Sequence, residues 1–283
     1  MNLGCPVLMY NGTTKNPDQL QVDDILMSDQ QKPVSVIAIN ERQYNIFKLT
    51  QKGGKRLKFN LPGNAKIRLK KYDAQIKKFL TVEINVDVFK YLSLNQLREY
   101  YLYKQEEISF IKTKLPIPPY ELGRKSLSDP LNSIDFLSIS QKDYLKKFYH
   151  DNKFTFPKDY IYAPIDDRKL FFCGIIDAYA FTNQSIKCFQ IMASNNDYLN
   201  DIERISNSLG FVTDVKKNKL IIKGNFTAMP LLKHAGFVSS ISKSYYQFDI
   251  KYIGKMRYKG ICTNLNNNFL AANGIVLPSV PAT

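Results

Sequence analysis

The feature that most constrains this chain is an almost wholly apolar stretch at residues 168–180, RKLFFCGIIDAYA. It contains two small residues, Gly174 and Ala178, that lie four positions apart and therefore on one face of a helix. Small residues at that spacing let a second backbone come close. Asp166 or Asp167 suits the first turn, where free N–H groups and the helix dipole favour an acid. The stretch therefore predicts a buried helix whose small face receives another helix.

The charge of the chain indicates a polyanionic partner. Its 283 residues include forty Lys and Arg against twenty-five Asp and Glu, a formal net charge of +15. A surface of that sign attracts nucleic acid. Lysine-rich surfaces also serve solubility alone, so composition by itself leaves the two interpretations even. The hydrophobic content of 44% is enough for sizeable cores, and we expect a folded, soluble protein.

The cysteine and hydropathy patterns favour an intracellular protein. Cys5, Cys173, Cys188 and Cys262 lie far apart and form no C-x-x-C pair, and the sequence has only two histidines. We therefore expect no disulfide framework, no zinc site and a reducing compartment. The sequence has no long apolar run and no charged-then-apolar leader, so we expect neither a membrane span nor a secretory signal.

The nine residues 172–180, FCGIIDAYA, resemble the LAGLIDADG motif of homing endonucleases, with Gly174, Asp177 and Ala178 among the matches. In that family the motif helix packs against a second copy, and the acid at the eighth motif position holds the catalytic metal. This chain has Tyr179 there. A phenol that ionises near pH 10 replaces poorly the hard carboxylate oxygens that Mg²⁺ needs. The resemblance therefore implies a nuclease relative that lacks its main metal ligand.

A first copy of the motif is less complete. The stretch PPYELGRKSLSDP matches the family at Gly123, but Ser128 stands where the acid belongs and Asp129 comes one residue late. We expect Pro130 to stop this helix at once. Asp129 and Asp177 are thus vestigial acids, and they are candidate metal ligands only in a shifted geometry. The chain between the two motifs is also too short for a full first half-domain, so we expect that half to be truncated.

Both ends of the chain resemble inteins and other Hint domains. Residues 6–29, PVLMYNGTTKNPDQLQVDDILMSD, are similar to the opening block, which reads roughly as a strand, a DGT turn and VGDxLM. Residues 258–279, YKGICTNLNNNFLAANGIVLPS, are similar to the closing blocks. The resemblance implies that the two ends close on each other in one β domain.

The residues that inteins use for splicing are replaced. Cys5 is a displaced candidate nucleophile, although we favour a small buried residue as its role. Asn64 and Ala65 stand in place of the Thr-x-x-His element, and Pro278 and Ser279 replace the closing His-Asn. Serine cannot form the succinimide that releases the splice junction. We therefore do not expect protein splicing.

The predicted fold is α+β. Residues 1–115 and 245–283 are expected to form an all-β Hint-type horseshoe, and residues 116–244 an inserted, reduced α/β LAGLIDADG-like domain. The Pro-rich joint KTKLPIPPY marks the first boundary.

Shorter patterns predict individual elements. Asn11-Gly12 predicts a hairpin turn, and residues 86–97 predict one amphipathic helix. Residues 197–211 predict a second amphipathic helix, ending at Gly210, and residues 212–225 predict a hairpin that turns at Lys217-Asn218.

The expected function is that of a catalytically degenerate homing-endonuclease and intein relative that binds double-stranded DNA. Basic and polar residues of the Hint-like loop and of the strands after the motif helix are the predicted contacts: Lys52, Lys55, Arg56, Lys58, Asn183, Gln184, Ser185, Lys187, Gln190, Lys216, Lys217, Lys219 and Lys223. Asn183, Gln184 and Ser185 are the candidates for reading base edges.

Two alternatives stay open. One is an active Mg²⁺-dependent endonuclease that uses Asp177 and Asp129 in a shifted geometry; without that activity we expect no cofactor and no metal. The other is a structural protein-interaction module in which the charge is incidental. A protein partner, or a homodimer through the helix face of Gly174 and Ala178, is a further option. The expected location is the nucleus or another DNA-containing compartment.

Overall fold

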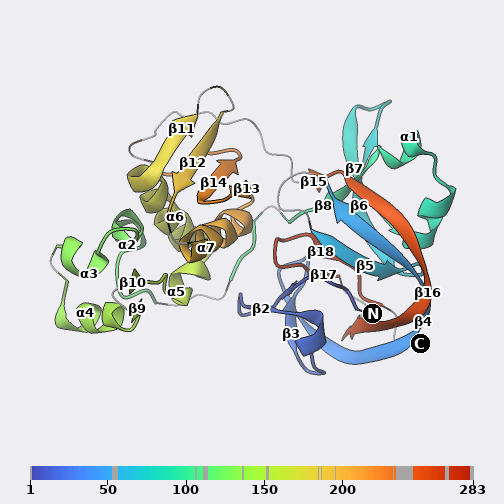
Figure 1. Cartoon of the computed structure of the whole chain (residues 1–283), viewed down its shortest axis with the longest axis horizontal. Helices are drawn as coiled ribbons and strands as arrows, with labels where there is room; N and C mark the ends of the chain where they lie inside the picture. Colours follow the sequence, from blue (N-terminus) through green and yellow to red (C-terminus); the bar gives the residue numbers. More distant parts are fainter. Residues whose placement is uncertain are drawn as a thin grey trace. The chain divides into compact units, whose positions relative to one another are not determined.

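Strands dominate the first hundred residues and the end of the chain, and helices gather in the middle (Figure 1). This computed structural model divides into two units: unit 1 is Met1–Gln105 with Ser244–Thr283, and unit 2 is Glu106–Lys243. From the sequence we expect joints at residues 115/116 and 244/245. The structure describes residues 2–52, 57–105, 107–110, 114–135, 137–150, 153–183, 185, 187–194, 196–231, 233, 245–264 and 268–280. The protein is thus a mixed α+β chain.

Unit 1 consists of antiparallel strands. The long strands β4 (Pro33–Gln51) and β16 (Phe248–Thr263) pair along their length, with register shifts at Tyr252/Gly254 and Cys262/Thr263. Two shorter strands, β3 (Ile25–Met27) and β5 (Lys58–Pro62), also pair with β4. A second sheet has the order β15-β8-β6-β7 and comprises β15 (Tyr245–Tyr246), β8 (Tyr100–Tyr103), β6 (Lys66–Asp73) and β7 (Lys78–Asn85).

The two ends of the chain share the core of unit 1. Strand β1 (Val7–Leu8) pairs with β2 (Thr14–Lys15), and β17 (Phe269–Leu270) pairs with β18 (Val276–Leu277). A bridge between Val7 and Ala271 joins the two hairpins. The first hairpin turns as its sequence predicts, because Gly12 adopts φ 86°, a region that glycine enters without strain.

The predicted helix at residues 86–97 is wrong. The structure has instead a 3-10 helix η2 (Val86–Tyr91) and one short α-helix, α1 (Leu94–Leu97). Ser93 lies between them in an extended conformation and accepts a hydrogen bond from the Gln96 amide. Serine favours this N-cap role over a helix interior, so it starts a new helix and does not continue the old one.

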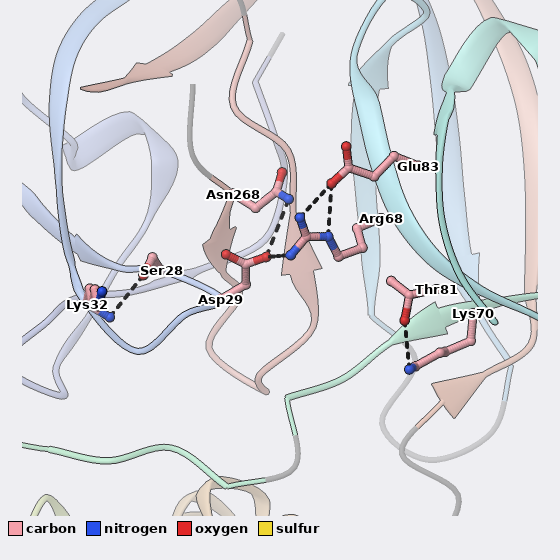
Figure 2. Close-up of polar contacts among 8 residues, drawn as sticks. All are labelled: Ser28, Asp29, Lys32, Arg68, Lys70, Thr81, Glu83 and Asn268. Atoms are coloured by element: carbon pink, nitrogen blue, oxygen red, sulfur yellow. Dashed lines mark hydrogen bonds and ion pairs between the residues drawn. The ribbon is translucent and has the colours of Figure 1, made fainter. Parts of the chain in front are cut away.

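A buried carboxylate ties a turn of unit 1 to its second sheet (Figure 2). The Asp29 side chain is 4% exposed and forms an ion pair with the Arg68 guanidinium on β6. Arg68 also donates to Glu83 on β7, at 2.6 and 3.0 Å. The Asn268 amide reaches Asp29 from the C-terminal segment at 3.5 Å. Because a buried charge without a partner is costly, Asp29 and Arg68 together link the turn after β3, the β6–β7 hairpin and the C-terminal segment.

Unit 2 places helices against one face of a four-stranded antiparallel sheet (Figure 1). The sheet has the order β11-β12-β14-β13 and comprises β11 (Ala180–Asn183), β12 (Cys188–Met192), β14 (Lys219–Lys223) and β13 (Val212–Lys216). Helices α6 (Ile165–Tyr179) and α7 (Asn196–Ser208) pack on it through one shared apolar core. The predicted helix ending near Gly210 and the hairpin turning at Lys217 are confirmed, with φ 88° at Gly210 and 51° at Lys217.

Shorter elements precede this half. They are α2 (Pro119–Lys125), α3 (Pro130–Ser133), α4 (Ile139–Lys146), β9 (Tyr149–His150), β10 (Lys153–Phe154) and α5 (Lys158–Ile161). We predicted that Pro130 would end this helix, but α2 already ends at Lys125. Pro130 instead begins α3, at the first helical position, where a missing N–H costs nothing.

Helices α2 and α6 touch backbone to backbone. A Cβ built at Gly174 would overlap the Tyr120 carbonyl and lie 2.8 Å from the Arg124 amide nitrogen. A Cβ built at Gly123 would overlap the Phe171 carbonyl. The small-residue face predicted for α6 is therefore confirmed at Gly174, and its partner is α2 of the same unit. Ala178, one turn later, is partly buried.

Two further expectations concern the cysteines and the membrane. All four cysteines are free and buried. Over the described ranges, the structure has no helix with both the length and the apolar character needed to cross a bilayer.

Replacing Gly174 with alanine should destabilise unit 2 by about 2 kcal/mol. Alanine stabilises a helix by up to about 1 kcal/mol relative to glycine. Overpacking of its methyl group against the rigid backbone of α2 costs about 3 kcal/mol. The loss of stability is measured as a shift in the urea concentration at which half of the α6 amides become exposed. Pulsed hydrogen exchange reports that exposure. The control Arg124→Ala removes only an exposed ion pair to Glu121 on α2 and should change stability by less than about 0.5 kcal/mol. Equal midpoints for Gly174→Ala and the unmodified protein would contradict the close helix contact.

Candidate nucleic-acid interface

The sheet of unit 2 has one face that its helices leave uncovered. Phe189, Ile191, Leu220 and Ile222 are buried beneath α6 and α7, so their strand neighbours lie on the opposite face. We call that opposite face the basic sheet face; its residues are Phe181, Asn183, Cys188, Gln190, Met192, Val212, Asp214, Lys216, Lys219, Ile221 and Lys223. Cys188 and Ile221 are buried among their neighbours. Five of the predicted DNA contacts, from four different strands, therefore share one surface.

The basic sheet face carries lysines at its two ends, and its middle row holds three uncharged side chains and one acid. The strand register places Phe181, Gln190 and Ile221 in one row, next to Asp214. One end holds Lys216 and Lys219, which are cross-strand partners. Lys223 lies at the other end of β14, four residues from Lys219. Four residues of an extended strand span about 14 Å.

The turns add further lysines at the same two ends. Lys217 lies in the turn from β13 to β14, and Lys187, with φ 45°, lies in the turn from β11 to β12. Both lysines and Ser185 are exposed. Lys216 lies 3.5 Å from Asp214, but this pair is solvent-exposed, and such pairs contribute little.

Of the four predicted DNA contacts on unit 1, the structure describes two. Lys52 forms an ion pair with Asp249 at 2.6 Å, and Lys58 is exposed at the start of β5. The predicted contacts Lys55, Arg56 and Gln184 lie outside the described residues.

The two vestigial acids are engaged by different groups. Asp177 is 5% exposed; it accepts hydrogen bonds from the Tyr120 hydroxyl and the Lys233 amide, both at 3.0 Å. Burial, and then the bond to Asp177, raises the pKa of Tyr120 to about 12, so this phenol stays a donor at neutral pH. Asp177 thus bonds within the helix pair and to the segment that follows the sheet.

Asp129 lies in a separate cluster. It accepts hydrogen bonds from the Tyr149 hydroxyl at 2.5 Å and the Asn132 amide at 2.7 Å. These two bonds lower the pKa of Asp129, since they stabilise its charged form. Asp129 and Asp177 therefore accept hydrogen bonds from two different tyrosines, Tyr149 and Tyr120.

Tyr179 is tied to the end of the opposite helix. Its hydroxyl accepts a hydrogen bond from the Leu127 amide at 3.3 Å, next to Ser128. The Ser128 hydroxyl donates to the Lys125 carbonyl at 2.8 Å. The side chains at positions 128 and 179, where the sequence resemblance leads us to expect acids, thus both bond to backbone groups at the end of α2.

Most of the residues that the sequence resemblance aligns with splicing positions are buried in unit 1. Burial raises the pKa of the Cys5 thiol to about 12, so the reactive thiolate is scarce. The Ser279 hydroxyl is buried and accepts a hydrogen bond from the Thr263 amide at 2.9 Å. Pro278 and Ala65 are also buried, whereas Asn64 is exposed.

Two apolar residues of the basic sheet face were missed from the sequence. Phe181 is 66% exposed and Met192 is 57% exposed. Met192 follows the buried Ile191 at the end of β12, so a strict period-2 reading of CFQIM would have placed it on the outer face. In AFTN the exposed Thr182 follows Phe181, so the burial pattern of β11 does not alternate strictly.

Comparisons with known proteins name no family. No profile of a protein family matches the chain, and no curated protein sequence matches it significantly. Within the described part of the chain, no group of three or more His, Cys, Asp or Glu side chains is placed to hold a metal ion.

Placing acids at positions 128 and 179 should create a divalent-cation site. We expect Mg²⁺ to raise the melting temperature of the double variant Ser128→Asp/Tyr179→Asp, because facing carboxylates at the two helix ends repel until a cation binds. At a hundredfold excess over Kd the gain is about 2.7 kcal/mol. The unmodified protein and Ser128→Asp/Tyr179→Phe should show no gain over NaCl of equal ionic strength. A Mg²⁺-specific gain in the unmodified protein would contradict this account of Tyr179.

Proposed function

We propose that this chain is a double-stranded DNA-binding protein that has lost nuclease and splicing chemistry. It derives from a homing-endonuclease intein, with a Hint-type horseshoe in unit 1 and a reduced LAGLIDADG-like domain in unit 2. The observation that carries the proposal is the basic sheet face, an uncovered surface with lysines at both ends and Gln190 and Phe181 between them.

The dimensions of the basic sheet face suit a major groove. Lys219 and Lys223 lie about 14 Å apart along β14, and the groove of B-DNA is about 12 Å wide. Lysines at that separation reach the phosphates on both rims. Gln190 and Phe181 then face the base edges, where an amide bonds adenine and a ring contacts the thymine methyl group. Asn183 and Ser185 extend the polar contacts towards the Lys187 turn.

The ends of the helix pair lack the acids that metal-dependent cleavage would need. The family's metal ligands correspond to Tyr179 and Ser128, whose hydroxyls bond to the backbone of α2 and its C-terminal turn. Asp177 and Asp129 accept hydrogen bonds from two different tyrosines. A shifted active site would have to break both sets of bonds, so the active-endonuclease alternative has less support. The short elements between α2 and α6 agree with a reduced first half-domain.

Duplex binding should weaken steeply with salt, and the slope should depend on the lysines of the basic sheet face. About eight phosphate contacts give a slope of about −7 in log affinity against log salt. The triple variant Lys216→Gln/Lys219→Gln/Lys223→Gln should flatten the slope by about 2.7. Fluorescence anisotropy with a labelled duplex measures both values.

The matched control is Lys142→Gln, an exposed lysine on α4 away from the sheet, which should leave the slope unchanged. The same samples, incubated with Mg²⁺ and run on a denaturing gel, should contain intact strands. Cut strands would establish the active endonuclease. Weak binding with no salt dependence would support the protein-interaction module.

Phe181 should give the duplex complex a preference for thymine methyl groups. We expect alternating poly(dA-dT) to bind more tightly than poly(dA-dU), which lacks only those methyls, by roughly 3- to 5-fold if one buried methyl is worth about 0.8 kcal/mol. Phe181→Ser should remove this difference without changing the salt slope. Leu170→Ser, a partly exposed position on α6, is the matched control. Equal affinities for the two polymers would show that Phe181 does not contact bases.

A further inference from the structure

A second sheet, in unit 1, also has one face outside the core. In β6 the buried residues Ile67 and Leu69 face the core, and Leu102 of β8 pairs with Leu69. Their strand neighbours therefore lie on the other face. We call it the aromatic sheet face; it contains Lys66, Arg68, Lys70, Tyr72, Phe79, Thr81, Glu83, Asn85, Tyr101, Tyr103 and Tyr245.

Five of these eleven residues are aromatic, and none of the five is fully buried. The Phe79 ring centroid lies 4.0 Å from that of Tyr245, 5.1 Å from Tyr72 and 5.3 Å from Tyr101. Tyr101 and Tyr245 are 5.2 Å apart. Rings from four strands thus form one continuous, partly exposed aromatic surface, and exposed patches of this kind often mark interaction sites.

Cations are interleaved with the rings. The Lys70 ammonium lies 4.8 Å from the Tyr103 ring centroid and donates to the Thr81 hydroxyl at 2.9 Å (Figure 2). Arg68 lies two residues away on the same strand and pairs with Glu83 and Asp29. Lys66, two residues further along the same face, is exposed. The free positive charge on this face therefore comes from Lys66 and Lys70.

We propose that the aromatic sheet face binds single-stranded nucleic acid, with unpaired bases stacked on the tyrosine and phenylalanine rings and phosphates held by Lys70 and Lys66. Every base has a π face, so a platform of rings accepts any sequence. The bases of an intact duplex are stacked on each other and are closed to such a surface. This site is separate from the basic sheet face, which the proposed function assigns to duplex DNA.

The charge and ring pattern favour this ligand over an apolar peptide. Lys70 lies over a ring, where a cation and an aromatic face attract each other and where a phosphate next to a stacked base would find its counter-charge. A net charge of +15 adds a general attraction for polyanions.

The test uses the full chain and fluorescein-labelled oligo(dT) of about 12 nucleotides at low salt, because such lengths fill one single-strand site. We expect binding, and we expect Phe79→Leu and Tyr103→Leu each to weaken it by roughly 5- to 150-fold, because each removes a stacking ring. Leucine keeps an apolar side chain in the sheet. The matched control Tyr91→Leu removes a tyrosine of unit 1 that is 83% exposed and lies outside this face, and it should bind as the unmodified protein does.

Lys70→Gln provides a variant that leaves every ring in place. It should flatten the salt slope for oligo(dT) by about 0.7. The triple variant of the basic sheet face should bind oligo(dT) normally, so loss of duplex binding and loss of single-strand binding report on different proposals. The proposal is overturned if oligo(dT) does not bind. It is equally overturned if Phe79→Leu, Tyr103→Leu and Tyr91→Leu all bind it with the affinity of the unmodified protein.

Discussion

The close approach of α2 and α6 at Gly123 and Gly174 is the contact on which the rest of unit 2 depends. Neither glycine has room for a Cβ, so the two backbones define each other's position. Ala180, the C-cap of α6, is also the first residue of β11. The helix pair therefore fixes the edge from which the sheet is built. Because α6 and α7 bury one side of that sheet, the same packing leaves the basic sheet face uncovered.

In our proposal, the ends of the helix pair explain how such a scaffold is stable without a bound metal. Two carboxylates held there would repel each other, and a cation would be needed to offset that repulsion. A tyrosine and a serine need none, since each hydroxyl bonds to a nearby backbone group. In our proposal the loss of cleavage therefore removes two like charges from the ends of the helix pair and leaves the sheet intact for binding.

Local patterns predicted local structure well. The apolar stretch of α6, the period of α7 and the β13–β14 hairpin each depend on residues close together in sequence, and the structure confirms them. The prediction of a single helix at 86–97 was wrong because Ser93 caps a new helix, which the spacing of apolar residues alone does not reveal. The Asp29–Arg68 ion pair and the aromatic sheet face could not be predicted, because both depend on pairing between strands far apart in sequence. The proposed DNA contacts came from family resemblance and charge, and only the fold showed which of them share a surface.

Lysine footprinting tests the central claim most directly. The protein is acetylated at low reagent concentration with and without saturating duplex DNA, and each lysine is quantified by mass spectrometry. Our account predicts that Lys187, Lys216, Lys217, Lys219 and Lys223 become protected together, while Lys142 and Lys146 on α4 stay reactive and the recovered strands stay intact. Unchanged reactivity of the five lysines in a DNA-bound sample would contradict the basic sheet face as the binding surface.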